Sequence, residues 1–128
     1  MKKLCLTLLG TLCLISNVFA APKQLITHNR TNVETNAYID GVIASQHPTK
    51  ANSDNHVFWA SAKLACYGRT VNNNCRALIK MATDTANPVD LGWATINLIT
   101  GDISPTYISG NGYHLEVNGP GETTLYKD

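Results

Sequence analysis

Two histidines and an aspartate in one polar segment of the chain could bind a metal ion. His47, Asp54 and His56 lie in or beside residues 46–55, QHPTKANSDN. Imidazole nitrogens and carboxylate oxygens are suitable ligands for zinc or copper, and the same groups can transfer protons. Their spacing matches no metal-site motif, and the alternative is a solvated loop with two surface histidines. We expect no cofactor unless these three side chains meet around a metal.

A second group of residues could recognise a ligand through aromatic stacking and positive charge. These residues belong to the stretch 57–82, VFWASAKLACYGRTVNNNCRALIKMA. Aromatic rings beside cations suit carbohydrate rings, anionic sugars or a protein partner. Alternatively, the tryptophan lies under a neighbouring loop and the cations are only solvated. The group comprises Trp59, Lys63, Tyr67, Arg76 and Lys80 on one predicted face, with Arg69 in the adjoining loop.

The sequence lacks the motifs of nucleophilic or glycosidic catalysis. No G-x-S-x-G elbow is present, and the few acidic residues are scattered, whereas glycosidases need a facing pair of carboxylates. The four histidines and many hydroxyls could still meet in the folded chain. The sequence favours a non-catalytic protein, with a small metal-dependent hydrolase as the alternative.

The stretch 57–82 also holds Cys66 and Cys75, which we expect to form a disulfide. Period-two alternation places Phe58, Leu64 and Cys66 on one face of a first arm, and Cys75 and Ile79 on one face of a second. Gly68 and three consecutive asparagines between the arms are typical of a turn. The pattern predicts a β-hairpin closed by the Cys66–Cys75 bridge, with Leu64 buried beside it.

A helix is the competing interpretation of the first arm. Asp54 or Asn55 could cap a helix over residues 56–67, with Gly68 ending it. Alanine-rich runs favour helix intrinsically. The aromatic and β-branched flanks favour the strand.

The first twenty residues have the features of a secretory signal peptide. Lys2 and Lys3 give a positive start, residues 4–15 are mostly apolar, and Val18-Phe19-Ala20 forms a small-residue cleavage site. The apolar run is too short for a membrane span. We expect cleavage before Ala21, a periplasmic or secreted bacterial protein, and no stable membrane insertion after cleavage.

Export determines how the cysteines and charges are interpreted. Cys5 and Cys13 leave with the signal peptide, so only two of the four cysteines remain, in an oxidising compartment that favours a structural bridge. Loss of Lys2 and Lys3 changes the formal net charge from +1 to −1. Nucleic-acid and anionic-membrane partners require a concentrated basic surface, so we expect a protein or carbohydrate partner and no nucleic acid.

The remaining segments predict short strands separated by Gly, Asn and Pro turns. Residues 35–45, 91–99 and 107–109 are apolar or alternating, and Trp93 belongs to an apolar run that suggests a core position. The chain ends in a predicted hairpin of residues 113–117 and 122–126, which could lie at a sheet edge. We expect one all-β domain over residues 21–128: a small antiparallel sandwich or partly open barrel of about 6–8 strands.

Three functions follow from these patterns. The favoured one is a non-catalytic exported domain that binds a protein or glycan at the cell envelope or outside the cell. The second is a metal-binding protein or metal-dependent hydrolase that uses the loop from His47 to His56. The third is a self-associating surface or pilus-like subunit that pairs through the terminal hairpin.

Overall fold

The computed structural model describes residues 20–128 of the chain. The predicted signal peptide, Met1 to Ala20, lies outside this range except for Ala20. Within residues 20–128, no helix has the length and apolar character needed to cross a membrane.

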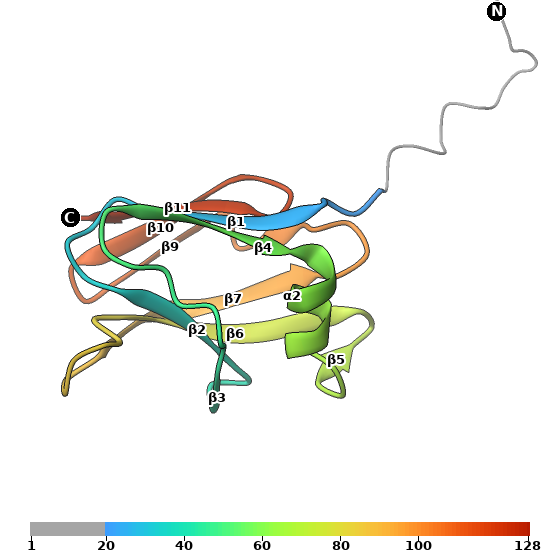
Figure 1. The fold of residues 1–128 in the computed structure, drawn as a ribbon, viewed down its shortest axis with the longest axis horizontal. Helices are drawn as coiled ribbons and strands as arrows, with labels where there is room; N and C mark the ends of the chain where they lie inside the picture. Colours follow the sequence, from blue (N-terminus) through green and yellow to red (C-terminus); the bar gives the residue numbers. More distant parts are fainter. Residues whose placement is uncertain (1–19) are drawn as a thin grey trace, which may run out of the picture.

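In residues 20–128, two β-sheets lie face to face, and one short helix lies at one end between them (Figure 1). The first sheet has five strands, in the order β4 (Ser53–Phe58), β1 (Gln24–Asn29), β11 (Glu122–Lys127), β10 (Tyr113–Gly119) and β9 (Tyr107–Gly110). The second has six, in the order β3 (Ile43–Ala44), β2 (Thr35–Ile39), β6 (Asn74–Met81), β7 (Val89–Asn97) and β8 (Ile103–Ser104), with β5 (Thr70–Val71) paired to β6. The helix is α2 (Trp59–Ala65).

This architecture confirms the predicted β-sandwich with one disulfide. Among the described strands, eight have four or more residues, and β3, β5 and β8 have two residues each. All strand pairs are antiparallel except β1 with β11, which run parallel. The sequence predicted an antiparallel sandwich, and the parallel pairing of β1 with β11 differs from this prediction.

The core lies between the sheets in two apolar clusters. One contains Ile39, Trp59, Cys66, Cys75, Ala77 and Leu98, and the other contains Met81, Leu91, Ile108, Leu115 and Leu125. Alternation along each strand sends every second side chain inward. In the six-stranded sheet, for example, Ile39 pairs with Ala77 and Ala77 with Ala94, all on the inner face.

The predicted hairpin over residues 57–82 is wrong in its first arm. β4 ends at Phe58, and the next seven residues, WASAKLA, form α2 instead of a strand. The buried residues Trp59, Ala62 and Cys66 follow the spacing of one helical face, and the alanines favour helix. β6 pairs with β2 and β7, and Leu64 is 74% exposed instead of buried beside the bridge.

The predicted disulfide is present although its surroundings differ. It joins Cys66, at the C-terminal end of α2, to Cys75 in β6, with 6.0 Å between the Cα atoms. Both cysteines are buried in the core. The bridge therefore fixes the helix to the inner face of the six-stranded sheet and closes the loop that carries β5.

The terminal hairpin forms as predicted, but it does not lie at an edge. β10 pairs with β11, while β11 also pairs with β1 and β10 with β9. Both strands thus have neighbours on each side. Its backbone is not available for the edge pairing expected of a self-associating subunit.

The fully buried Asn29, at the end of β1, connects this strand to the long polar loop. The Asn29 amide donates to the carbonyl oxygens of Val33, Thr49 and Lys50, at 2.8, 3.2 and 3.1 Å. Its Oδ1 accepts from the backbone N–H and the hydroxyl of Thr31. A buried polar side chain needs such partners, and these bonds position the loop between β3 and β4.

Candidate binding surface

The outer face of the six-stranded sheet presents a row of aromatic and apolar side chains. Leu78 of β6 pairs with Tyr38 of β2 on one side and with Trp93 of β7 on the other. Arg76 and Lys80 lie two residues either side of Leu78, so they share its face. We call these five residues the aromatic–cationic surface.

Each cation of this surface lies over an aromatic ring. The Arg76 guanidinium carbon is 4.1 Å from the centroid of the Trp93 ring, and the Lys80 Nζ is 4.8 Å from the centroid of the Tyr38 ring. Such contacts contribute roughly 0.5–1 kcal/mol at exposed sites and hold long side chains in place. The Trp93 side chain nevertheless remains 41% exposed. The surface therefore combines a pre-positioned cation with accessible aromatic area.

The charges of this surface are only partly neutralised by the protein itself. The Lys80 Nζ lies 3.6 Å from an Asp90 carboxylate oxygen, and Arg69 at the border of the surface is paired with Asp40. Arg76 has no carboxylate of residues 20–128 within 4.0 Å. Its guanidinium can therefore donate two parallel hydrogen bonds to a carboxylate of a ligand.

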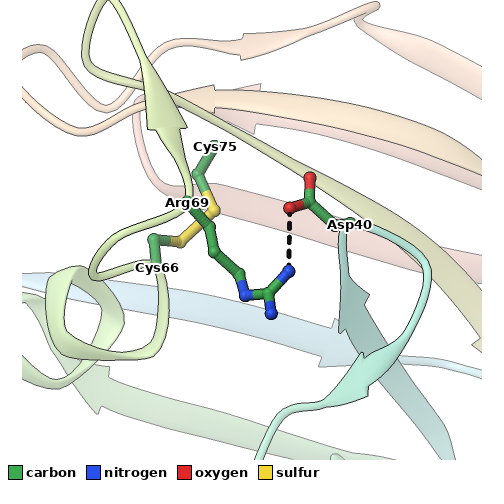
Figure 2. The surroundings of a disulfide bond; sticks show 4 residues. All are labelled: Asp40, Cys66, Arg69 and Cys75. Atoms are coloured by element: carbon green, nitrogen blue, oxygen red, sulfur yellow. Dashed lines mark hydrogen bonds and ion pairs between the residues drawn. A yellow bond between two sulfur atoms is a disulfide. The ribbon is translucent and has the colours of Figure 1, made fainter.

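The disulfide loop carries Arg69, whose side chain contacts Asp40 (Figure 2). The Arg69 Nη1 lies 3.2 Å from the Asp40 Oδ2, and the Arg69 backbone N–H donates to the carbonyl of Cys66. The backbone N–H of Asp40 donates in turn to the carbonyl of Arg76 at 2.9 Å. The disulfide loop is thus linked, through Arg69 and Asp40, to the backbone of Arg76.

Gly41 brings the turn after β2 against the edge of the Trp93 ring. A Cβ atom at this position would lie 2.6 Å from the Trp93 Cη2, and its φ of +78° favours glycine. The next residues, Val42 and Ile43, are 70% and 43% exposed. The turn therefore limits the freedom of the indole and extends the apolar area beside it.

The predicted binding residues do not all share this face. Trp59 is buried, with 7% exposure, and its Nε1 donates to the carbonyl of Leu98 at 3.0 Å. The prediction of an outward Trp59 is therefore wrong. Arg76 and Lys80 do point outward from β6, but their aromatic partners are Trp93 and Tyr38.

The other predicted binding residues lie beyond the sheet face. Lys63 is on α2, Tyr67 follows the helix with 84% exposure, and Arg69 is in the disulfide loop. A binding role for these three residues stays a prediction. The sequence suggested a core position for Trp93, so its place on the binding surface was missed. The polar residues Thr95 and Asn97, which alternate in phase with Trp93 along β7, were the signal for an outward face.

The three predicted metal ligands do not converge. Asp54 and His56 point outward from β4, where Asp54 lies beside His28 and Arg30 and the His56 ring bonds to Gln24. Asn55, between them on the opposite face, donates to the carbonyl of His47. His47 is therefore separated from the other two by the strand, and residues 20–128 contain no cluster of three or more ligating side chains suited to a metal ion.

A histidine held between two carboxylates lies on the outer face of the five-stranded sheet. The His28 Nδ1 is 2.8 Å from Asp54 and its Nε2 is 2.6 Å from Glu122. Hydrogen bonds with Asp54 first, and then with Glu122, raise the pKa of His28 above its usual value. The His28 bond lowers the pKa of Asp54, and Arg30 adds to this shift. The cluster is a pH-dependent cross-link between β1, β4 and β11.

The fold and this surface define a small disulfide-bonded β-sandwich with an exposed aromatic–cationic face. A family model described as T2SS substrate NttC matches residues 1–128, and the chain belongs to this family of type II secretion substrates. The crystal structure of the Legionella pneumophila type II secretion system substrate NttC is 56% identical, with a TM-score of 0.84. The alignment covers 84% of this chain and 100% of that one. The search of curated proteins found no match.

Family membership confirms the predicted localisation. Type II secretion substrates are exported through the periplasm to the outside of the cell. Of the two compartments expected from the sequence, the exterior is therefore the destination.

Proposed function

We propose that the protein binds an acidic patch of a partner protein outside the cell, through its aromatic–cationic surface. The observation that carries this proposal is the position of Arg76, which lies 4.1 Å over a partly exposed Trp93 and has no carboxylate of residues 20–128 within 4.0 Å. A carboxylate of the partner would complete this site.

The residue types of the surface support a protein interface. Tryptophan, tyrosine and arginine are the residues enriched at the energetic centres of interfaces, and Trp93, Tyr38 and Arg76 lie together around Leu78. Cation–π contacts hold both cations before binding, which lowers the entropy lost on association. The exposed Val42 beside Gly41 extends the apolar contact area.

A glycan is the second candidate ligand. The exposed part of the Trp93 ring offers a flat apolar face on which a sugar ring could stack, and Arg76 suits an acidic sugar. The two candidates use the same residues and differ in the probe that binds. Parallel glycan-array and protein-capture measurements distinguish them.

The test compares two double variants that remove one aromatic ring and one cation each. Trp93→Ala with Arg76→Ala removes the centre of the surface. Tyr107→Ala with Arg30→Ala is the matched control, since both residues are exposed on the outer face of the opposite sheet. We expect the first variant to lose capture of its partner from an extract of cell-surface proteins and the control to retain it. Equal capture by both variants would exclude this surface.

The proposal takes Ala21 to Asp128 as the secreted domain, after removal of Met1 to Ala20. The basic start, apolar run and small-residue site of the sequence support this cleavage. Intact-mass measurement of the secreted protein tests it directly.

A further inference from the structure

An apolar cavity of about 150 Å³ lies between the two sheets. Leu25 and Val57 line it from the five-stranded sheet, Ala77 and Ala94 from the six-stranded sheet, and Ala62 from α2. Protein interiors seldom contain voids much larger than a water molecule. A space of this size is therefore a feature of this fold that needs a physical cause.

Small side chains on the six-stranded sheet and on α2 leave space for the cavity. The inner faces of sandwich sheets are normally about 10 Å apart and are filled by interdigitating large side chains. Here five alanines line the space, while the opposite sheet contributes larger residues such as Leu25 and Val57: Ala37, Ala77 and Ala94 lie on the inner face of the six-stranded sheet, and Ala62 and Ala65 on α2. The disulfide between Cys66 and Cys75 fixes the end of α2 to β6. The alanine side chains of the six-stranded sheet and of α2 are therefore too short to fill the space in front of the five-stranded sheet.

One end of the cavity is polar and reaches the surface. Its lining includes Asn36, Ser45, His47 and Asn55, of which His47 is exposed. The loop that carries His47 runs along β2, where Ser45 donates its N–H to the carbonyl of Ala37, and then leads into β4. The buried Asn29 amide holds the same loop by donating to the carbonyl oxygens of Thr49 and Lys50. This end is thus a fixed polar rim beside an apolar interior.

We propose that this cavity binds a small amphipathic molecule, with a single aromatic ring or short alkyl chain inside and a polar group at the His47 rim. An apolar cavity of about 150 Å³ in another protein accommodates benzene, which sets the size of the apolar part. A sugar would lose hydrogen bonds to water on entering such a lining without replacing them. The apolar part of the site is distinct from the aromatic–cationic surface, because the sheet residues that line it, such as Ala77 and Ala94, point inward.

The test uses benzene and hexanoate as probes, with glucose as the negative probe, and follows backbone amide shifts by NMR. We expect benzene and hexanoate to shift the amides of lining residues, while glucose shifts none. Ala62→Leu and, from another wall, Ala94→Leu fill the cavity and should weaken both apolar probes at least tenfold. Ala60→Leu is the matched control, since Ala60 is exposed on the same helix, and should bind as the wild type does.

The polar rim has its own variant and readout. His47→Ala should weaken hexanoate at least threefold and leave benzene unchanged, because only hexanoate has a group to place at the rim. Unmoved lining amides at millimolar benzene, or equal binding by the filled variants and the wild type, would overturn the cavity as a ligand site. Equal loss of both probes in His47→Ala would overturn the orientation that we assign.

Discussion

The two tryptophans should respond in opposite ways to substitution by phenylalanine. Trp59 is 7% exposed and donates its indole N–H to the Leu98 carbonyl, whereas Trp93 is 41% exposed and lies under Arg76. Trp59→Phe leaves the buried carbonyl unpaired, at a cost of about 1–3 kcal/mol. It also removes part of a buried ring, for which complete truncation to alanine costs about 3–5 kcal/mol. We expect Trp59→Phe to lower the free energy of unfolding by about 2–4 kcal/mol.

Trp93→Phe should change the free energy of unfolding by no more than about 0.5 kcal/mol, as is usual for surface positions. A phenyl ring can still lie under Arg76, so the cation–π contact is largely retained. At about 4 °C per kcal/mol for a domain of this size, Tm should fall by roughly 8–16 °C in the first variant and by about 2 °C or less in the second.

Urea unfolding followed by fluorescence measures this difference, because each variant retains one tryptophan as its reporter. Acrylamide should quench the tryptophan of Trp59→Phe, which retains Trp93, more strongly than the tryptophan of Trp93→Phe. Equal losses of stability in the two variants would refute the assignment of Trp59 to the core and Trp93 to the surface.

Three further predictions concern the disulfide, the histidine cluster and export. The double variant Cys66→Ser and Cys75→Ser should lose about 2.5–3 kcal/mol of unfolding free energy from the loop-closure estimate, and two free thiols in the secreted wild type would contradict the bridge. Because the pKa of His28 is raised in the folded protein, its stabilising contribution is present below its ordinary pKa and is lost as pH rises through the folded pKa. The difference in urea midpoint between the wild type and His28→Gln should therefore shrink from pH 6 to pH 9. A difference that stays constant with pH would count against the cluster. Intact mass of the secreted protein should correspond to a start at Ala21, and retention of residues 1–20 would disprove the proposed cleavage.

The sequence predicted the fold where alternation was regular and failed where a short helix interrupted it. The terminal hairpin and the strands near residues 35–39 and 91–97 could be located from apolar alternation and turn residues. In α2 the alanines fit either period, and the burial of Trp59 and Cys66 depends on contacts with distant strands. A seven-residue helix is too short to give a strong periodic signal.

The candidate surface was predicted on the cationic side and missed on the aromatic side. Arg76 and Lys80 follow the regular alternation of β6, so their outward direction could be read from the sequence. In β7 the register shifts opposite Ile79 and Lys80, near Gly92. Leu91 is buried and Trp93 is exposed although they are two residues apart. Such a bulge resets the alternation, so the apolar residues before it suggested a core position for Trp93, and only Thr95 and Asn97 after it indicated the outward face.

The most direct test of the central claim is the affinity of the captured partner protein for the wild type and for Trp93→Ala. A residue at the energetic centre of an interface contributes at least about 2 kcal/mol, which corresponds to roughly thirtyfold in Kd. We predict a loss of that size in a variant that still unfolds cooperatively. An unchanged Kd in the folded variant would contradict the role of the aromatic–cationic surface.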